Sequence, residues 1–282
     1  MNIYRVLPSL TRERQMKIWH KALRSQWSAT DLNWDVPATR LRERHLREKL
    51  ARILTPILMG EQSALYSVSG LIPVLGHRSE VEGQLYLTTW AVDEARHTEL
   101  FTLFYGRIDG EPMSIRRFPS GYLFQSQIVS KEPAEWLSGV LISEVLAQLV
   151  MREFERLDID GVLSEIAHGI LRDEARHLGF NHIYLEDRFA ELFVHDPVEA
   201  ERFAAQLRRH LRDVLSFVPP MFDAVDSELA EIGIDRYWLF EELSKEAMDR
   251  LDKSIASGQR LAERQSPEDT SGSVAISSGS EA

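Results

Sequence analysis

The sequence contains no cysteine among its 282 residues. The absence of cysteine excludes disulfides, iron–sulfur clusters, thiolate zinc sites and a cysteine nucleophile. Basic residues are also scarce relative to acidic ones, with 33 Lys and Arg against 44 Asp and Glu, so the formal net charge is −11. This surplus of negative charge argues against a nucleic-acid partner or an anionic membrane partner.

Long apolar runs are missing as well. The N-terminal segment Met-Asn-Ile-Tyr-Arg-Val-Leu-Pro has no apolar core of the length that a signal peptide needs, and no later stretch runs 18 residues without a charge. We therefore expect a soluble, cytoplasmic protein without a membrane partner. At 282 residues the chain is long enough for one large domain, and a division into two is not required.

What the sequence does contain is a pentapeptide that occurs twice. Asp93-Glu94-Ala95-Arg96-His97 returns with the same five residues at 173–177. Each copy includes a Glu-x-x-His, and at about 3.6 residues per turn positions i and i+3 lie on one face of a helix. Each copy therefore aims a carboxylate and an imidazole at one place. Two copies, with one further Glu from each of two other helices, form the ligand pattern of a two-metal carboxylate bundle.

Glu61 and Glu144 are the candidates for the two further carboxylates, because each stands alone in an apolar helical stripe. A Glu inside such a stripe is costly unless it is paired or bound to a metal. The alternative is a surface Glu at the edge of a helix. The predicted metal ligands are Glu61, Glu94, His97, Glu144, Glu174 and His177.

A single Glu-x-x-His is weak evidence, since about one is expected by chance in a chain of this composition. Glu165-x-x-His168 is such a match. Glu165 lies nine residues before Glu174, which at 100° per residue places the two on opposite sides of one helix. We therefore exclude this third match from the site.

The spacing of the ligands along the chain gives an independent test. About 15 residues lead from Glu61 to a turn near 76–79, and about 15 more lead back to Glu94. About 14 and 13 residues separate Glu144 and Glu174 from a turn near 158–161. In two antiparallel helical hairpins the members of each pair would then reach the same depth. The carboxylates and imidazoles would meet at one level.

The hydrophobic periodicity predicts helices over 9–28, 39–75, 79–107, 132–157, 160–190, 196–219, 221–231 and 236–255. The segment 28–37 should be a packed connector across the bundle, and 107–130 should be a long crossover with one short helix. Residues 1–255 would form one domain. Residues 256–282 are rich in Ser, Gly, Glu and Gln and would form a disordered tail.

Asp93 and Asp173 each precede a predicted glutamate ligand directly. An imidazole that binds a metal usually donates its other N–H to a carboxylate. Because each Asp sits beside the Glu of its own helix, we expect it to reach the histidine of the facing helix, with Arg96 and Arg176 screening these acids. A surface salt bridge is the alternative interpretation for both Asp residues.

The predicted ligand set is rich in oxygen and has only two nitrogens, which suits iron or manganese rather than copper or structural zinc. Two ions bridged by carboxylates can bind O₂ between them and can together store the electrons that its activation needs. We therefore predict a cofactor of two Fe ions, with Mn possible at one position, and O₂ as a co-substrate. Glu94, Glu144 and Glu174 are the predicted catalytic residues.

The six-ligand pattern resembles the ferritin-like di-iron carboxylate superfamily. It is most similar to the branch of the small (beta) subunit of ribonucleotide reductase and its related di-iron oxygenases and oxidases. The resemblance spans roughly residues 15–255. It implies an all-α fold, a ferritin-like four-helix bundle core extended to about eight helices. The stretch 26–34 is similar to the family's N-terminal element, which implies that Trp27 touches the residues behind the ligands.

Three departures from the family patterns reduce the number of activities that the resemblance allows. Phe101 stands where radical-forming members carry a Tyr, seven residues after Glu94, which disfavours a true reductase subunit. Ile170 stands where the arylamine N-oxygenases add a histidine. Ala64 and Gly139 stand where the oxidases with a Val–Tyr crosslink have that Val and Tyr, so this crosslink cannot form.

The leading hypothesis is a non-haem di-iron monooxygenase or oxidase that uses O₂ to oxidise a C–H, C–N or N–H bond of a small organic substrate. Phe101 and Gln148 are predicted to line the substrate pocket. Electrons would come from a separate ferredoxin or reductase, and we expect a homodimer. The alternatives are a small-subunit-like protein of ribonucleotide reductase, a ferroxidase that handles iron, and a non-catalytic metal-stabilised protein.

Overall fold

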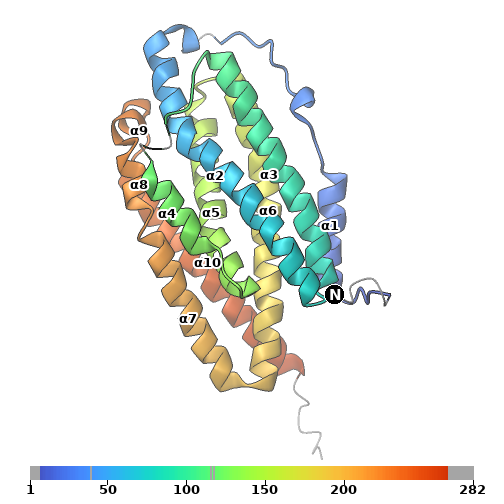
Figure 1. Ribbon diagram of the computed structural model, residues 1–282. Helices are drawn as coiled ribbons and strands as arrows, with labels where there is room; N and C mark the ends of the chain where they lie inside the picture. Colours follow the sequence, from blue (N-terminus) through green and yellow to red (C-terminus); the bar gives the residue numbers. More distant parts are fainter. Residues whose placement is uncertain (1–6, 39, 115, 117, 266–282) are drawn as a thin grey trace, which may run out of the picture.

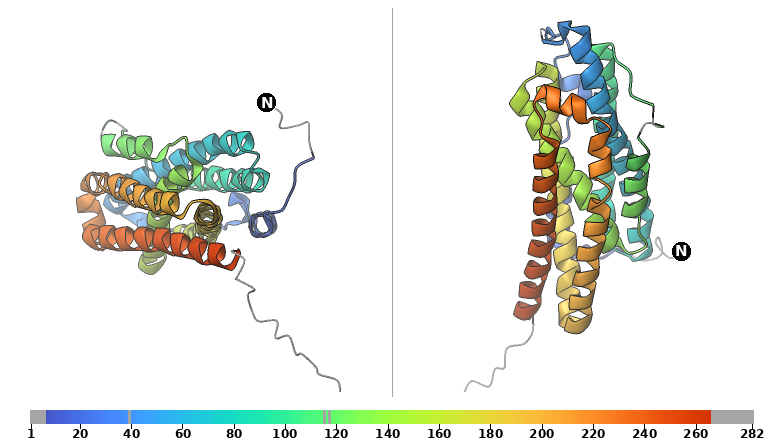
Figure 2. Two further views of the ribbon diagram at one scale, coloured as in Figure 1. Left: turned by 90° about the horizontal axis from the view of Figure 1, so that it is seen from below. Right: turned by 90° about the vertical axis from the view of Figure 1, so that its left-hand side faces the viewer.

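The computed structural model describes residues 7–38, 40–114, 116 and 118–265, and within them the chain is helical and has no strand (Figure 1). The helices form a bundle that is elongated along one axis (Figure 2). In chain order they are α1 (Glu13–Arg24), α2 (Arg44–His77), α3 (Val81–Ile108), α4 (Pro119–Ile128), α5 (Pro133–Leu157), α6 (Gly161–His195), α7 (Pro197–Leu215), α8 (Pro219–Asp223), α9 (Asp226–Ile232) and α10 (Arg236–Gln265), with short 3₁₀ turns η1 (Ala29–Asp31) and η2 (Arg40–Arg42) before α2.

The core of the bundle consists of two antiparallel hairpins, α2 with α3 and α5 with α6. The first hairpin turns through Ser79 and the second through Asp158, whose φ angles of 62° and 44° are in the left-handed region that short polar residues tolerate best after glycine. Asp160 then caps α6 by accepting hydrogen bonds from the backbone N–H groups of Val162 and Leu163. Both turns lie where the sequence predicts them.

The remaining helices surround this core. α1 packs against α3 and α6, α10 packs against α5 and α6, and α7 packs against α5, α6 and α10. The short helix α4 lies against α2 and α5, as Figure 1 shows. The predicted all-α bundle, with a four-helix core and additional helices around it, is therefore confirmed.

The connector between α1 and α2 is fastened to the bundle by Arg107 of α3. Its guanidinium donates to the backbone carbonyls of Trp34 (2.9 Å) and Val36 (2.6 Å) and pairs with Asp160 at 2.9 Å. Trp34 Nε1 also donates to the carbonyl of Ala29 at 2.8 Å. The segment 28–37 therefore lies across the bundle, as the sequence predicts, and it brings the preceding Trp27 against the interior.

Some predicted boundaries were wrong. The first helix is shorter than predicted, the predicted helix 221–231 is divided into α8 and α9, and α10 continues ten residues past the predicted end at 255. α10 continues because its small residues let it pack closely on α6: a Cβ built on Gly258 would lie 2.5 Å from Phe189 Cβ, and Ala262 is buried. The rest of the predicted tail, 266–282, lies outside the described residues.

By length and composition α5 could also cross a membrane, and it is the one helix of the described chain that could. Within the bundle, however, 78% of its most apolar window is buried. An apolar helix that is buried on most of its surface is what the centre of a large helical bundle requires. We therefore interpret the apolar character of α5 as that of a core helix.

Candidate metal centre

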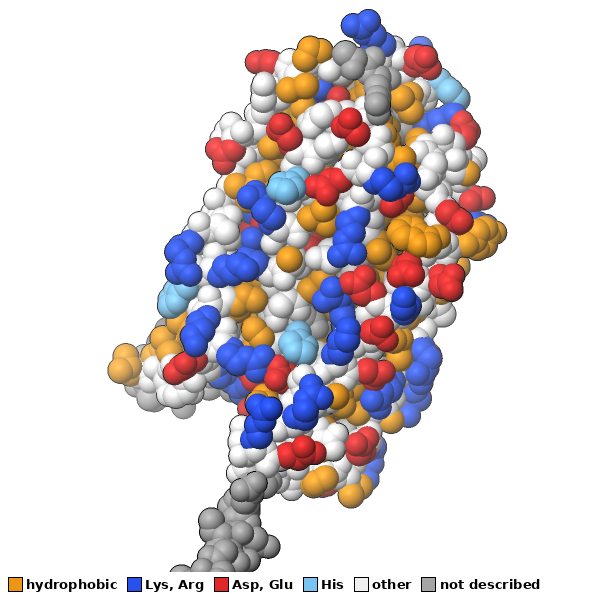
Figure 3. Space-filling model, turned by 180° about the vertical axis from the view of Figure 1, so that it is seen from behind, with side chains coloured by type: hydrophobic (Ala, Val, Ile, Leu, Met, Phe, Trp, Pro, Cys, Tyr) orange, Lys and Arg blue, Asp and Glu red, His pale blue; other side chains and the backbone are white. Residues whose placement is uncertain are grey.

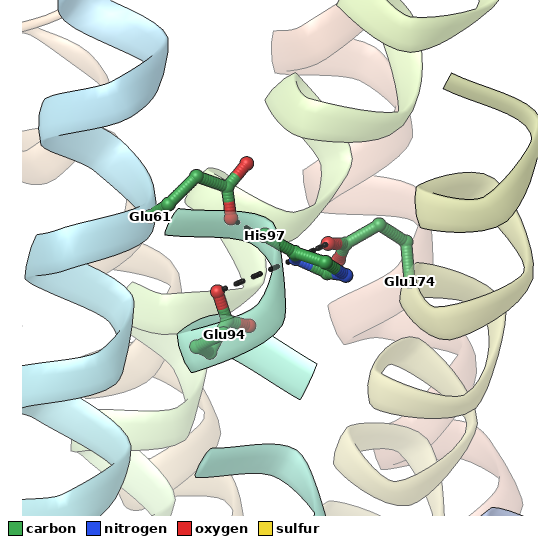
Figure 4. Close-up of side chains that lie close together, drawn as sticks. All are labelled: Glu61, Glu94, His97 and Glu174. Atoms are coloured by element: carbon green, nitrogen blue, oxygen red, sulfur yellow. Dashed lines mark hydrogen bonds and ion pairs between the residues drawn. The ribbon is translucent and has the colours of Figure 1, made fainter. Parts of the chain in front are cut away.

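The predicted metal ligands come together inside the bundle, on α2, α3, α5 and α6. Their ligand atoms form two overlapping groups, Glu61, Glu94, His97 and Glu174 in one and Glu94, Glu144, Glu174 and His177 in the other, and within each group the atoms lie within 4.8 Å of one another. All six residues are buried. Figure 4 shows the first group, with Glu61 approaching from α2 and Glu174 from α6 toward His97 on α3. Glu94 and Glu174 belong to both groups and therefore lie between them.

Both imidazoles turn the same ring nitrogen toward these carboxylates. Nδ1 of His97 lies 3.1 Å from Glu61 Oε2 and 3.7 Å from Glu174 Oε1. Nδ1 of His177 lies 2.9 Å from Glu144 Oε2 and 3.3 Å from Glu174 Oε2. In each group one imidazole and three carboxylates thus face a common point.

The other ring nitrogen of each histidine faces an aspartate on the opposite helix. Nε2 of His97 lies 3.2 Å from Asp173 Oδ2, and Nε2 of His177 lies 3.3 Å from Asp93 Oδ2. The crossed pairing is the one that the sequence predicts. A carboxylate at Nε2 favours the tautomer that carries its proton there, so each imidazole, once neutral, would present the Nδ1 lone pair to the carboxylate cluster.

A buried charge network lies behind the two aspartates. Arg96 and Arg176 each contact both of them, with Arg96 2.7 Å from Asp173 Oδ2 and Arg176 2.9 Å from Asp93 Oδ2. Trp27 Nε1 donates to Asp173 at 2.8 Å, so Trp27 lies where the family resemblance implies. The two arginines screen the aspartates, as expected, and none of these four charged residues is on the surface.

Gln26 was not predicted as part of this network. Its Nε2 donates to Asp93 Oδ1 at 3.1 Å, which parallels the bond from Trp27 to Asp173, and its Oε1 accepts from Arg96 at 3.0 Å. The available signal was the duplication itself. Because the pentapeptide occurs twice, a hydrogen bond from Trp27 to Asp173 suggests a second donor for the equivalent Asp93. Gln26, which directly precedes Trp27, is that donor.

Trp90 was also missed as a site residue. Its Nε1 donates to Glu94 Oε1 at 2.8 Å, and its ring stacks on the His177 imidazole with centroids 4.4 Å apart and an interplanar angle of 16°. Trp90 lies one helical turn before Glu94 on the same face, so its N–H was positioned to reach that carboxylate. It restrains one glutamate and one histidine at once.

Burial sets the ionisation of the glutamates. It raises the pKa of Glu61 to about 7 and the pKa values of Glu144 and Glu174 well above the usual range. Burial acts in the same direction on Glu94, but hydrogen bonding to His97 and the charges of both imidazoles outweigh it and lower the pKa of Glu94. Without cations, the site therefore keeps part of its carboxyl groups protonated.

The pKa values of the two histidines are raised as well, whereas those of the two aspartates are lowered. Burial favours neutral imidazoles, but the carboxylates outweigh it and raise the pKa of His177 to about 9 and the pKa of His97 well above its usual range. Burial is likewise overcome at the aspartates by the facing histidines and the arginines, which lower the pKa of Asp93 to about 2 and the pKa of Asp173 still further. The aspartates are thus charged and the imidazoles are held between two sets of acids.

The donor set fits two divalent metal ions. Four buried carboxyl groups and two imidazoles crowd one region, and Glu94 Oε2 is buried with no hydrogen-bond partner in the described structure. A buried acceptor without a donor is costly and is explained when an ion is its missing partner. Oxygen-rich sites of this kind prefer iron or manganese.

A cavity of about 210 Å³ adjoins the cluster, and the glutamates at 61, 94, 144 and 174 form part of its wall. The rest of the wall is mainly apolar and comes from α2, α4, α5 and the segment from α8 to α10. It includes Ile53, Ile57, Phe124, Val140, Val150, Met151, Phe222, Val225 and Leu239. The carboxylate cluster is therefore open to a small, largely apolar molecule.

The two predicted pocket residues do not line this cavity. Phe101 is fully buried in the core, and Gln148 accepts a hydrogen bond from Arg152 at 3.1 Å. On α5 the neighbouring Ala147 is on the cavity wall instead. Val140, Glu144 and Met151 of α5 do line the cavity, so the inward face of this helix was predicted correctly and only the placement of Gln148 on the wall was wrong. The excluded His168 is exposed and faces Glu155 at 3.0 Å, outside the cluster.

No family model matches the chain, and no curated protein matches it in sequence. Solved structures match its fold. An R2-like ligand-binding oxidase from Sulfolobus acidocaldarius superimposes with a TM-score of 0.63 at 15% identity, over 90% of this chain and 94% of that one. A variant of an R2-like ligand-binding oxidase with an aerobically reconstituted Mn/Fe cofactor gives 0.68 at 18% identity, over 86% and 93%.

A further R2-like ligand-binding oxidase with an aerobically reconstituted Mn/Fe cofactor gives a TM-score of 0.60 at 16% identity, over 86% of this chain and 92% of that one. At these identities the similarity shows the fold. The chain has the fold of the R2-like ligand-binding oxidases.

Proposed function

We propose that this protein is an O₂-dependent oxidoreductase that holds two metal ions, iron at both positions or manganese at one, and oxidises a small organic substrate in the adjoining cavity. The observation that carries the proposal is the meeting of two overlapping ligand groups with a mainly apolar cavity whose wall includes four of their carboxyl groups. Structural neighbours with Mn/Fe cofactors support the choice of metals.

The ligand groups assign the side chains to the two ions. Glu61 and His97 would hold one ion, Glu144 and His177 would hold the other, and Glu94 and Glu174 would contact both. When bound, such a pair of ions supplies the electrons and the Lewis acidity that O₂ activation requires. Glu94, Glu144 and Glu174, the predicted catalytic residues, all lie on the cavity wall and so face the substrate.

The surrounding residues would keep the ligands in position. Asp93 and Asp173 hold the Nε2 protons of the histidines, and Trp90 fixes one oxygen of Glu94 by its hydrogen bond. Arg96 and Arg176 keep the aspartates ionised through buried ion pairs. Such support is what maintains a metal ligand in one orientation.

The cavity side chains would bind the substrate and exclude water. Hydroxylation of a C–H bond by O₂ takes two electrons and two protons from outside the substrate and releases one water. The described residues contain no strand and so no dinucleotide-binding βαβ unit. We therefore propose that a separate ferredoxin or reductase supplies these electrons. We also propose a cytoplasmic location and a homodimer, which cell fractionation and light scattering would test.

The oxidising capacity is directed to a bound molecule rather than to a Val–Tyr crosslink. Ala64 lies on the cavity wall, where it offers only a methyl group. Gly139 has no room for a tyrosine, because a Cβ at this position would already lie 3.1 Å from the backbone Cα of Ile128 in α4. The helix α4 occupies the space that such a side chain would need.

The proposal is tested by loading the protein with Fe²⁺ and following O₂ consumption with a reductant, while mass spectrometry detects oxidation of candidate amines, acids and acyl compounds. We expect O₂ consumption to exceed the oxidation of the iron added and to be abolished in Glu94→Ala. Glu165→Ala, an exposed change on α6, is the control and should leave both activities unchanged. Turnover that survives in Glu94→Ala would contradict the proposal, and O₂ use without an organic product would indicate a ferroxidase.

A further inference from the structure

The cavity beside the carboxylate cluster has one polar end. Gln125 on α4 reaches across to α2, where its Nε2 donates to Ser67 Oγ at 2.5 Å and to the backbone carbonyl of Ser63 at 3.3 Å. Gln125, Ser63 and Ser67 all line the cavity. Because the carbonyl of Ser63 can only accept, the amide nitrogen must face α2.

This arrangement leaves one acceptor and one donor for a ligand. Both hydrogens of Nε2 are used on α2, and Oε1 of Gln125 has no partner among the described residues. Ser67 is 1% exposed, and its oxygen accepts the bond from Gln125 while its own hydrogen has no acceptor in the described part of the chain. A buried hydroxyl without an acceptor is unusual unless a bound group provides one.

The cavity offers no counter-ion at this end. Apart from Tyr122, the ionisable residues on its wall are the four glutamates of the cluster, and no Lys, Arg or His among the described residues lines it. A carboxylate or phosphate placed near Gln125 would be desolvated without a cation, and an ammonium would lie away from the acids. The polar end therefore suits a neutral group.

The polar end and the apolar end lie on opposite sides of the glutamates. Ser67 follows Glu61 by six residues on α2, or about 9 Å along the helix axis. In the other direction Ile53 precedes Glu61 by eight residues, or about 12 Å. Ile53 belongs to the apolar end, which Val225 and Leu239 complete. A molecule that fills the cavity would pass the carboxylate cluster between its two ends.

We propose that Gln125 and Ser67 form a recognition point for the neutral head group of an amphiphilic substrate, one that both donates and accepts a hydrogen bond as a primary amide does. The head would donate N–H to Gln125 Oε1 and accept from the Ser67 hydroxyl, while its apolar chain extends past the glutamates. This inference rests on the proposed function, because it assigns the oxidation to a carbon part-way along that chain. Gln125 and Ser67 are positioning residues in this scheme.

The size of the cavity selects the probe. A volume of about 210 Å³ corresponds to about seven water molecules at about 30 Å³ each. Octanamide is of suitable length, and methyl heptyl ketone has the same shape and carbonyl but lacks the N–H donor. The ratio of the two affinities therefore reports the hydrogen bond to Gln125 Oε1 rather than the burial of the chain.

The test is calorimetric titration of the full-length protein with each probe under anaerobic conditions, after its metal content has been measured. We expect the parent protein to bind octanamide about 3- to 10-fold more tightly than the ketone. Gln125→Leu should remove this preference. Ser67→Ala should weaken the binding of both probes, because the carbonyl of each accepts the hydrogen bond from the Ser67 hydroxyl. The control is Gln127→Leu, an exposed change on the same helix that leaves the cavity wall intact.

Equal affinities for the two probes in the parent protein, no octanamide binding, or an unchanged preference in Gln125→Leu would each overturn the recognition point. The measurement needs no O₂, so it separates this inference from the proposed function. A Gln125-dependent preference in a protein that never consumes O₂ would support the recognition point and remove the oxidase. O₂-dependent oxidation, together with an unchanged preference for octanamide in Gln125→Leu, would support the oxidase and remove the recognition point.

Discussion

His177 on α6 faces Asp93 on α3, with Nε2 3.3 Å from Oδ2, and the duplicated pentapeptide repeats this relationship in reverse between His97 and Asp173 at 3.2 Å. Each helix thus supplies the carboxylate that orients the imidazole of the other. The tandem Asp-Glu makes this possible, because adjacent residues on a helix point about 100° apart. The two helices are locked in one register by a pair of equivalent contacts.

Removing one of these aspartate charges should weaken metal binding. We expect Asp173→Asn to reduce the affinity for Mn²⁺ or Fe²⁺ by about 10- to 100-fold, since a neutral amide holds the His97 proton less well. Competition with a chelating dye measures this affinity. Asp213→Asn, a change at an exposed residue of α7, should leave it unaltered. Equal affinities for the parent and Asp173→Asn would show that this aspartate does not support the ligand.

Gly169 is required for the approach of Trp27 to Asp173. A Cβ at this position would lie 2.3 Å from two ring carbons of Trp27, so Gly169→Ala must displace the indole. We expect a loss of about 1–3 kcal/mol in the free energy of unfolding, as for other overpacked sites, measured by denaturant titration.

Gly106→Ala on α3 is the matched control, because nothing lies within 4 Å of a Cβ there. It should stabilise the protein by about 0.5–1 kcal/mol, since alanine is the better helix former. Equal effects of the two substitutions would mean that the position of Trp27 is not constrained by Gly169.

Trp90 provides a hydrogen bond that matters most when no metal is bound. Trp90→Phe keeps an aromatic ring against His177 but leaves Glu94 Oε1 without its donor. We expect it to destabilise the metal-free protein by about 1–3 kcal/mol more than Trp136→Phe, whose indole N–H has no partner in the described structure. Added Mn²⁺ should reduce this difference, because a bound ion would satisfy the glutamate. A difference that is unaffected by metal would contradict the assignment of Glu94 as a ligand.

Metal binding should release protons. In the metal-free protein burial raises the pKa of Glu61 to about 7 and holds the pKa values of Glu144 and Glu174 well above the usual range. Ligation requires ionised carboxylates, so the apparent affinity should rise with pH through 7. A pH indicator in weakly buffered solution would detect the protons on addition of Mn²⁺. Binding with no proton release near pH 7 would contradict these pKa shifts.

The positions of the ligands could be predicted because they follow from local geometry. The relation of Glu94 to His97 depends only on the helical repeat, and the equal depth of Glu61 and Glu94 depends only on the lengths of two hairpin arms. The crossed aspartates follow from the same repeat. These spatial relations between the ligands do not depend on how the helices are tilted, so they could be predicted from the sequence alone.

The cavity could not be predicted in the same way. Ala147 and Gln148 both lie within about one turn of Glu144 on α5, and which of the two reaches the cavity wall depends on how the neighbouring helices pack, which no periodicity fixes. The contribution of Gln125 depends on where α4 lies, in a crossover whose Gly and Pro content indicates only a break. Similarly, Gly258 lies in a segment whose composition predicted a disordered tail, whereas this glycine allows close packing of α10 on α6.

The central claim is that six side chains from four helices hold two metal ions, and anomalous X-ray scattering from crystals loaded with Mn²⁺ or Fe²⁺ tests it most directly. Two anomalous peaks per chain are predicted, one in contact with Glu61 and His97, the other in contact with Glu144 and His177, and both in contact with Glu94 and Glu174. A metal-loaded crystal with no peak in this cluster, or with a single peak elsewhere on the protein, would contradict the account.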